Sequence, residues 1–516
     1  MIIDSLKAKL FNKIFKFSIP LKHIFIIIFI FTCVFAVIRL FDLDNYAMHR
    51  DELANGLDAY TLGINGTNIW GEKFPVFFKL HNTDLLEPTY KYLLVPFVYL
   101  FGRTEFSVRI LGVLISIFSI FFIFKVAKEI FNNTKLAYLS AFFLSISFVN
   151  FIFSRIGFRA NLIPLYLIFI IFFFYKTKKN EHYFPLLMLS LGLTLWTYAV
   201  SRVMIPVLCL LPLYLILNKN IKINLIQILT GAIIFITLAF PIYYLSFFDK
   251  TFAARTAKVA VFDESNALEL VQKNIASYYS WDYNFSKGDT NKRYNVAGFG
   301  FENPVIIILS LLGVVVALKK KKEFGFVVLI VYVSCMLPGF LTEPYHSLRT
   351  LGVVIPLVLL ASYGAMFVLT KHFAMFKLLI LLAITINIVF NIDYFFYNKK
   401  GHNAFYPGIK EAVIYANNIA KPVNVIYGFG IYRPYVFQLF YGQSYGGAAK
   451  SYVDEFTSRQ CNVGTNIVDC YYHPEFTKQG NIYIEQENRL SGLENFAEIV
   501  FMSKDNFGEK QYAVIK

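Results

Sequence analysis

The sequence predicts an all-α polytopic membrane protein with about 11 transmembrane helices, helices in the outer-face loops, and a small C-terminal α/β domain outside the membrane. Three observations support this prediction. Of the 516 residues, 57% are hydrophobic. Apolar runs long enough to cross a bilayer recur as far as residue 396. Beyond that point, short helical and strand patterns alternate with polar turns, which is typical of a domain in water.

The first apolar run, from Ile24 to Leu40, follows a lysine-rich N-terminal stretch. Secretory signal peptides and uncleaved first spans both begin in this way. No small-x-small cleavage site follows the run, which ends in "FAVIRLFDLD". We therefore expect an uncleaved first transmembrane helix.

A transmembrane helix needs roughly 17–25 apolar residues, and by this measure the chain has about eleven candidate spans. They lie near residues 23–41, 107–127, 135–154, 160–175, 182–199, 203–217, 224–247, 303–318, 324–341, 350–370 and 374–396. The stretch "YLLVPFVYLFG", Tyr92–Gly102, is too short to cross. We expect it to form a re-entrant or interfacial helix on the outer surface.

The lysines predict the orientation of the chain. With the N-terminus inside, every inner turn carries lysine, as in "KVAKEIFNNTK", "KTKKN", "NKNIKIN", "KKKKE" and "KHFAMFK". The positive-inside rule then places the N-terminus in the cytoplasm and the C-terminal domain outside the cell membrane. The chain divides into a membrane domain, 1–397, and an extracytoplasmic domain, 398–516, with a first outer loop near 42–106 and a large outer loop near 248–302.

The C-terminal domain has clear local patterns. We expect helices at "YPGIKEAVIYANNIA" and "YRPYVFQLFYG", and strands at "KPVNVIYGFG", "GNIYIEQ", "AEIVFMSKD" and "KQYAVIK", the last two as a hairpin. Cys461 and Cys470 lie in this domain, in a compartment that permits disulfides. A bond between them and two free thiols are both left open, because sequence does not give connectivity.

The formal charge of +16 would suggest a nucleic-acid ligand in a soluble protein. Here the lysines form short clusters between apolar runs, where they face membrane lipids, and no nucleic-acid-binding motif is present. The five cysteines include no C-x-x-C pair, which argues against a zinc or thiol-redox centre. The charge therefore indicates membrane lipids as partners rather than nucleic acid.

The arginines are distributed differently from the lysines, since none of the 13 lies in a predicted inner turn. Arginine captures phosphate or carboxylate through two parallel hydrogen bonds, whereas lysine acts as a point charge. Arginines at the outer span ends therefore predict a site for a lipid-linked phosphate at the membrane border. The alternative is snorkelling and salt bridges to nearby acids. The candidate phosphate ligands are Arg50, Arg155, Arg159, Arg202, Arg349 and His346.

Two adjacent acids, Asp51 and Glu52, follow Arg50 where the first span ends, in a segment with helical spacing. Neighbouring side chains on a helix point about 100° apart, so the two carboxylates need not share a task. One of them can act as a general base for an incoming hydroxyl at a partly desolvated border. The alternative is a solvated amphipathic surface helix.

A third group lies in the outer turn "FLTEPYHSLRTLGVVIP", where Glu343, His346 and Arg349 follow at three-residue spacing. Three histidines and one acid also suggest a divalent metal ion as an alternative, although their spacing matches no ligand signature. These residues are His49, His81, His346 and Glu52. No cofactor is otherwise indicated.

Several stretches resemble a known family. They are "HRDELANGLDAY", "EPTYKYLLVPFVYLFGRTEFSVRILGVLIS", "LSISFVNFIFSRIGFRAN", "WDYNFSKGDTNKRYNVAGFG" and "EPYHSLRTLGVVIPLVLLASYG". Their order resembles that of the C superfamily of glycosyltransferases, and within it the family of protein O-mannosyltransferases and bacterial aminoarabinose transferases. The resemblance covers roughly residues 20–395.

The resemblance implies an inverting glycosyltransferase that uses a polyprenyl-phosphate sugar on the outer face of the membrane. The acceptor would be a hydroxyl of a lipid, a glycan or a protein. The family's first-loop aspartate falls on Asp51, which implies the role of base, with Glu52 as its structural or assisting partner. Arg155 and Arg159 fall in the region where relatives bind the donor phosphate, with His346 and Arg349 as further candidates.

One position departs from the family pattern. Aminoarabinose transferases carry a phosphate-contacting basic residue just before a proline, and here that position is Glu87, in "LLEPTYKYL". We expect Lys91 or another arginine to substitute for it, or the donor to bind differently. Tyr90, Lys91 and Glu343 are the candidate substrate-binding residues.

A transporter or flippase for lipid-linked sugars is the alternative function. Such proteins often show repeats and charges near the bilayer midplane. This sequence shows no repeat, and its charges cluster at the outer border instead. A membrane-anchored assembly protein is a third hypothesis. Eleven spans would be excessive for a membrane anchor.

Overall fold

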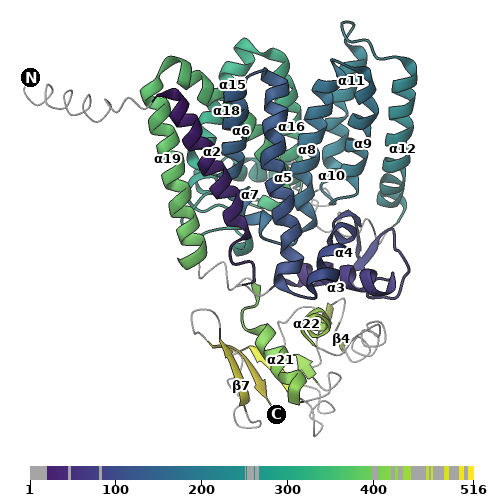
Figure 1. Ribbon diagram of the computed structural model, residues 1–516. Helices are drawn as coiled ribbons and strands as arrows, with labels where there is room; N and C mark the ends of the chain where they lie inside the picture. Colours follow the sequence, from purple (N-terminus) through teal and green to yellow (C-terminus); the bar gives the residue numbers. More distant parts are fainter. Residues whose placement is uncertain are drawn as a thin grey trace, which may run out of the picture.

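Apolar helices stand side by side in the computed structural model and form a bundle, with shorter elements gathered at one end of it (Figure 1). The structure describes residues 20–44, 48–80, 84–249, 252, 261, 266–397, 405–419, 425–427, 434–442, 461–463, 466–468, 482–486, 499–504 and 510–515. The bundle helices are α2 (Leu21–Val37), α5 (Glu105–Phe131), α6 (Thr134–Ser145), α7 (Phe148–Ser154), α8 (Leu162–Thr177), α9 (Phe184–Leu195), α10 (Ser201–Leu208), α11 (Leu210–Leu217), α12 (Leu225–Phe248), α15 (Pro304–Lys320), α16 (Lys322–Phe340), α18 (Val354–Lys371) and α19 (Phe373–Ile392).

A helix or a pair of helices lies at each of the eleven predicted spans. Within the described part of the chain, seven helical segments are individually long and apolar enough to cross a membrane. The pair α6 and α7, bent by 58°, would be an eighth. Helices α9, α10–α11 and α15 are shorter than this criterion requires. The mostly helical membrane architecture is confirmed, whereas the count of eleven stays a prediction.

The lysine-rich turns gather at one end of the bundle. Glu129, at the end of α5, pairs with Lys176 and Lys179 at the end of α8. Lys178 pairs with Glu323 at the start of α16. These turns lie opposite the end that carries the shorter elements (Figure 1). The segregation of charge between the two ends agrees with the predicted topology, and the side of the membrane on which each end lies stays a prediction.

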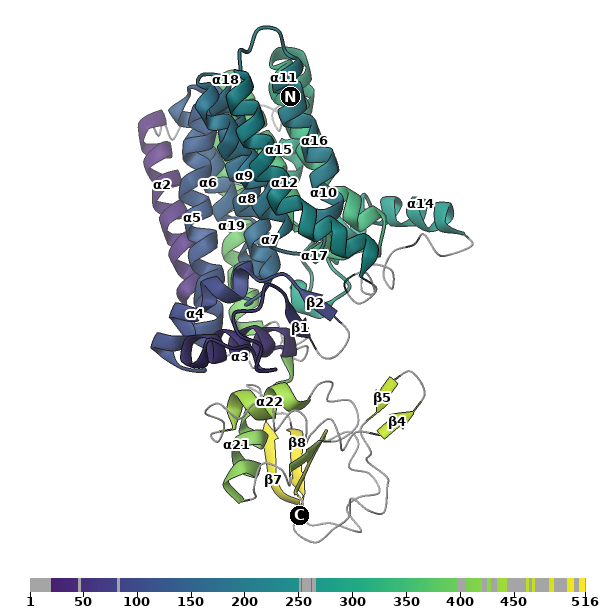
Figure 2. The same ribbon diagram turned by 90° about the vertical axis from the view of Figure 1, so that its right-hand side faces the viewer.

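Two helices lie across the other end of the bundle, α3 (Arg50–Asn65) and α4 (Thr89–Phe101), as Figure 2 shows. Helix α4 is formed largely by the short apolar stretch that was expected to be re-entrant or interfacial. Strands β1 (Phe78–Leu80) and β2 (Asp84–Leu86) form an antiparallel pair between them. The large loop contributes α14 (Ala267–Tyr278), a π-helical turn (Asp282–Ser286) and a 3-10 turn (Lys292–Tyr294). Helix α17 (Ser347–Thr350) precedes α18.

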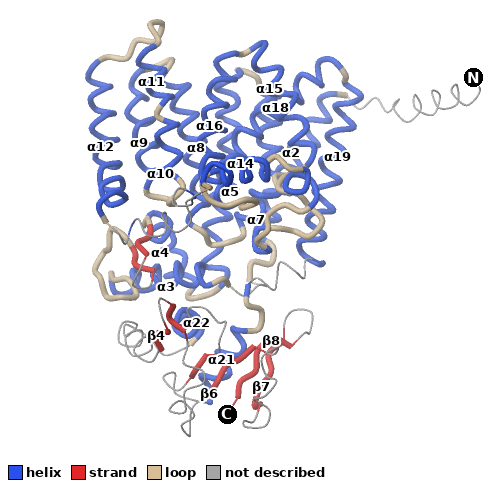
Figure 3. The backbone as a smooth tube through the Cα atoms, turned by 180° about the vertical axis from the view of Figure 1, so that it is seen from behind, coloured by secondary structure: helices blue, strands red, loops and turns tan. Residues whose placement is uncertain are grey.

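The C-terminal elements follow the predicted order. Helices α21 (Ile409–Ile419) and α22 (Pro434–Tyr441) lie beside a four-stranded sheet of order β3-β6-β8-β7. The strands are β3 (Val425–Tyr427), β6 (Ile482–Gln486), β7 (Ile499–Lys504) and β8 (Lys510–Ile515). Strands β7 and β8 pair antiparallel as expected. The short hairpin of β4 (Cys461–Val463) and β5 (Asn466–Val468) was not predicted. Figure 3 shows the strands confined to the end of the molecule away from the lysine-rich turns.

The question of a Cys461–Cys470 disulfide lies outside the described residues, because Cys470 is not among them. The lysine-rich stretch before the first span lies outside them as well.

The C-terminal part docks directly on α3. Gly56 is the contact point, because a Cβ there would lie 2.8 Å from a ring carbon of Phe440 in α22. Beside it, buried Glu105 accepts hydrogen bonds from the hydroxyl of Tyr441 at 3.2 Å and from Lys410 at 3.1 Å. Arg103 donates to the carbonyl of Leu439 at 2.6 Å. Helix α3 is therefore packed between the bundle end and the C-terminal part.

Two glycines allow a close contact between the backbones of α15 and α18 in the bundle core. A Cβ built on Gly313 would lie 2.0 Å from the carbonyl oxygen of Leu360, and one on Gly364 would lie 2.2 Å from that of Leu309. Small residues permit this approach of two backbones, which in a membrane replaces the hydrophobic effect as a source of association.

We expect Gly313→Ala to destabilise the protein by about 3 kcal/mol or more, because the clash is with backbone that cannot rotate away. The matched control is Gly325→Ala in α16, where the nearest atom to a new Cβ is a Leu318 methyl at 3.4 Å. Thermal melting in detergent should show a large loss for the first variant and little change for the second. Equal melting temperatures would contradict the close α15–α18 contact.

Candidate active site

The start of α3 is fixed by a capping box. The ring Nδ1 of His49 accepts a hydrogen bond from the backbone N–H of Asp51 at 3.2 Å. In return, the Oε2 of Glu52 accepts from the backbone N–H of His49 at 3.0 Å. These bonds satisfy the first amides of the helix and set where it begins. The two adjacent acids therefore leave the helix in different directions, as their spacing predicted.

Glu52 points into the protein and is fully buried. Its Oε1 accepts from the Nε of Arg109 at 2.9 Å and from the backbone N–H of Gly157 at 2.9 Å, and its Oε2 accepts from the Nη2 of Arg109 at 3.2 Å. Arg109 also donates to the carbonyl of Leu43 at 2.8 Å. Both carboxylate oxygens are thus occupied. The geometry supports the assisting, structural role expected for Glu52 and does not place it against a substrate.

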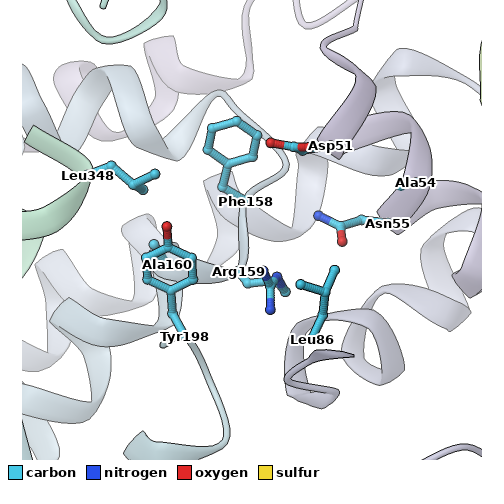
Figure 4. A pocket seen from close by; sticks show the side chains of 9 residues that line it. All are labelled: Asp51, Ala54, Asn55, Leu86, Phe158, Arg159, Ala160, Tyr198 and Leu348. Carbon is cyan, nitrogen blue, oxygen red and sulfur yellow. The ribbon is translucent and has the colours of Figure 1, made fainter. Parts of the chain in front are cut away.

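Asp51 points the other way, into a pocket of about 440 Å³ of empty space that includes its open mouth (Figure 4). Its side chain is 36% exposed and lies 3.5 Å from the Nδ1 of His49. The walls come from α3, the end of β2, the loop after α7, the turn before α10, and α17. The lining residues are Asp51, Ala54, Asn55, Leu86, Phe158, Arg159, Ala160, Tyr198 and Leu348. A carboxylate and a guanidinium thus share one cavity.

Arg159 belongs to a group of three charges. Its Nη1 lies 2.5 Å from the Oε2 of Glu87, while the Nη2 of Arg202 lies 2.6 Å from the Oε1 of the same carboxylate. The guanidinium of Arg202 stacks on Phe252 with its carbon 3.8 Å from the ring centroid. Burial would raise the pKa of Glu87, but the two arginines outweigh it and hold the pKa below its usual value. The structure thus brings two of the predicted arginines together, through a carboxylate.

The outer-turn group forms a second cluster beside the pocket. Glu343 accepts from the Nη2 of Arg349 at 2.9 Å and lies 3.3 Å from the Nε2 of His346. Arg349 also donates to the hydroxyl of Tyr198 at 3.3 Å, and Tyr198 lies under the guanidinium of Arg159. The predicted Glu343, His346 and Arg349 are therefore brought together, and Tyr198 joins them to the pocket wall.

Arg155 requires a correction. It is buried and donates to three backbone carbonyls, those of Arg39 at 2.9 Å, Phe41 at 2.6 Å and Asp42 at 3.0 Å. Its guanidinium also stacks near the ring of Phe395, 4.8 Å from the centroid. These bonds hold the chain that leaves the first span. Arg155 is therefore a structural clamp and does not face the pocket as a phosphate ligand.

Two predicted substrate residues are also corrected. Lys91 is fully buried and forms an ion pair with Asp58, which joins α4 to α3. Tyr90 is buried too, with its hydroxyl 3.5 Å from the carbonyl of Val108. Neither side chain lines the pocket, so Lys91 does not compensate for the acid at position 87. Arg159 and Arg202 lie against that acid instead.

Arg50 is not among the pocket-lining residues: its Nη1 donates to the hydroxyl of Tyr406 at 3.3 Å, and its Nε lies 4.0 Å from the Oδ1 of Asp51. Sequence reasoning missed Arg293, from the large loop, whose Nη1 lies 2.8 Å from the Nε2 of His49. The pattern that marked the other arginines as candidates, their absence from the predicted inner turns, also includes Arg293 and could have identified it. This contact brings the large loop next to the start of α3.

Among the described residues, no group of three or more His, Cys, Asp and Glu side chains is placed to hold a metal ion. His81, one of the four residues suggested for such a site, lies outside the described part of the chain. His49 and His346 lie in separate clusters, the first beside Asp51 and the second beside Glu343.

Residues 87–244 match the family model described as dolichyl-phosphate-mannose-protein mannosyltransferase. Among solved structures, the chain is similar to apo ArnT from Cupriavidus metallidurans, with 12% identity and a TM-score of 0.56 over 94% of this chain and 97% of that one. The chain has the glycosyltransferase C fold.

ArnT from Cupriavidus metallidurans bound to undecaprenyl phosphate gives a TM-score of 0.53 at 12% identity, over 96% of this chain and 98% of that one. No curated protein sequence matches the chain. The resemblance to glycosyltransferases of the C superfamily is confirmed, and the family-model match contains Glu87, Arg159 and Arg202.

We expect Glu52→Gln to destabilise this glycosyltransferase C fold by about 3–5 kcal/mol, because it leaves the buried charge of Arg109 without its counter-ion. The double variant Glu52→Gln/Arg109→Met should lose less than Glu52→Gln alone, since it removes that charge. Thermal melting of both variants in detergent measures the difference. A single variant as stable as the wild type would mean that Glu52 does not anchor α3.

Proposed function

We propose that this protein is an integral membrane glycosyltransferase that moves a single sugar from a polyprenyl-phosphate donor to an acceptor hydroxyl on the outer face of the membrane, with inversion. The observation that carries the proposal is the pocket shared by Asp51 and Arg159. The glycosyltransferase C fold and the family-model match support the reaction class. The known binding of undecaprenyl phosphate by ArnT supports the class of donor.

The Asp51 carboxylate suits removal of the acceptor proton, and the Arg159 guanidinium suits stabilisation of the departing phosphate. A carboxylate exposed in a cavity can accept the proton of an acceptor hydroxyl as its oxygen attacks the anomeric carbon. The bond between that carbon and the phosphate oxygen breaks, and its electron pair stays on the phosphate. The phosphate therefore gains one negative charge, which a guanidinium held in place beforehand stabilises without reorganisation. Asp51 is the proposed base, and Arg159, backed by Arg202, the proposed phosphate ligand.

The cluster of Glu343, His346 and Arg349 lies behind Tyr198 on the pocket wall. In this proposal the cluster contacts hydroxyls of the sugar or the acceptor rather than the phosphate. Arg349 is already charge-balanced by Glu343, 2.9 Å away. This pair has no net charge, whereas the group of Arg159, Arg202 and Glu87 keeps a charge of +1 for an anion.

Asp51→Asn should lower the rate of sugar transfer by about a hundredfold or more, because it removes the base. Donor binding should stay intact, because the side-chain volume does not change. The assay is release of polyprenyl phosphate in detergent from a panel of polyprenyl-phosphate sugars, with a membrane extract as acceptor. Asp282→Asn is the matched control, since Asp282 is an exposed loop acid paired with Lys287. Full turnover by Asp51→Asn would remove Asp51 from the mechanism. Donor binding by the wild type without release from any donor would favour the flippase instead.

Arg159→Gln and Arg155→Gln should behave differently although they lie four residues apart. The first should weaken polyprenyl-phosphate binding by about tenfold or more, since it removes a charge-assisted ligand. The second should lower the melting temperature, because it releases three backbone carbonyls. Binding of radiolabelled undecaprenyl phosphate and thermal melting separate the two effects. Equal binding losses at unchanged stability would restore Arg155 as a phosphate ligand.

A further inference from the structure

Glu87 stands between two arginines of the pocket side, and the proposed function gives it no role. Its side chain is 1% exposed, and each of its oxygens binds a different guanidinium. The three residues come from separate parts of the chain: the turn before α4, the turn before α8, and the start of α10. Its side-chain partners among the described residues are these two arginines, so a change of this carboxylate acts on them most directly.

The first effect of this acid is geometric. Two guanidinium groups side by side at a partly desolvated border repel each other by several kcal/mol at an effective dielectric constant near 20. A carboxylate that bridges them removes this repulsion and fixes their separation. Each arginine keeps further N–H groups, and the Nε of Arg202 is buried without a hydrogen-bond partner among the described residues. The bridge therefore uses only part of the donor set of each arginine, and Arg159 is the one of the two that lines the pocket.

The second effect is on net charge. Two guanidinium groups and one carboxylate sum to +1 (2 − 1). The neighbouring Arg349 adds nothing to this sum, because Glu343 balances it at 2.9 Å. A sugar linked to a lipid by one phosphate is a phosphodiester with a single negative charge, whereas a pyrophosphate linkage carries two. The free lipid phosphate that leaves carries about −1.5 to −2 near pH 7. Asp51, which lines the same cavity, has the Nε of Arg50 4.0 Å from its carboxylate and adds nothing to this sum either. The group of Arg159, Glu87 and Arg202, at +1, matches the first of these ligands and is undercharged for the others.

We propose that Glu87 is a specificity-determining residue: it joins Arg159 and Arg202 into one bracket of net charge +1, which selects a lipid-linked single phosphate over a pyrophosphate and limits retention of the released lipid phosphate. This inference rests on the proposed function, because it assumes that the bracket receives the donor phosphate. It explains why an acid stands at position 87. The acid lowers the affinity for dianions, so that the product leaves after transfer.

The test compares two probes, undecaprenyl phosphate and undecaprenyl pyrophosphate, as competitors of a labelled polyprenyl-phosphate sugar on the full-length protein in detergent. For the wild type we expect the monophosphate to compete at least as well as the pyrophosphate. In Glu87→Gln the pyrophosphate should gain about tenfold over the monophosphate, and turnover should become more sensitive to added undecaprenyl phosphate. Glu87→Asp keeps the charge, so its ratio should stay near that of the wild type.

Glu72→Gln is the matched control, because it removes one negative charge from the same outer loop at the exposed Lys79 pair. A Glu87→Gln variant that folds and shows the wild-type ratio would overturn the inference. If that variant does not fold, the competition assay on the wild type still tests the inference. A wild type that prefers the pyrophosphate probe would contradict the proposed match of charge. Failure of the wild type to bind either probe would instead refute the proposed function itself.

Discussion

The arrangement depends on one buried ion pair, between Glu52 and Arg109. Its carboxylate also accepts the backbone N–H of Gly157 and caps α3 through His49, so a single side chain fixes the helix that carries Asp51, the span α5, and the loop that carries Arg159. Asp51 can face a cavity only because its neighbour is held in the opposite direction. A buried charge pair of this kind contributes little net stability compared with apolar packing, but it determines geometry when every hydrogen bond is made. The separation of the base from the phosphate ligand across the pocket follows from this anchor.

The arginines divide into two groups with different tasks. Arg39, Arg109 and Arg155 bind backbone carbonyls or Glu52 and hold the chain where it leaves the first span. Arg159 lines the pocket, Arg202 is joined to it through Glu87, and Arg349 contacts Tyr198 of the pocket wall; all three pair with acids. Both groups exploit the same property, the planar fork of five donors that satisfies several acceptors at once. In a region that water reaches poorly, exposed carbonyls of an irregular segment need such donors as much as a ligand phosphate does.

Much of the architecture was predictable, because periodicity and length encode it locally. The helices at all eleven apolar segments, the surface helix α4, and six elements of the C-terminal part follow the sequence patterns. The divergence of Asp51 and Glu52 also followed from helical geometry. Pairing partners were not predictable: nothing near Glu87 in the sequence indicates that Arg159 and Arg202, over 70 residues away, meet its two oxygens. For the same reason Arg155 and Arg159 looked equivalent, although the turn between them directs one inward and the other to the pocket.

The contact of Gly56 with Phe440 joins residues that are made far apart in time. Helix α3 emerges early in synthesis, whereas α22 follows several hundred residues later, which at a few to twenty residues per second takes tens of seconds. Val108 of α5 also packs on Gly56 and is made early, so throughout that interval only the face of α3 that receives Phe440 stays uncovered. Helix α3 therefore completes its packing only near the end of biosynthesis, so a chain truncated before α22 would leave the face of α3 that receives Phe440 exposed.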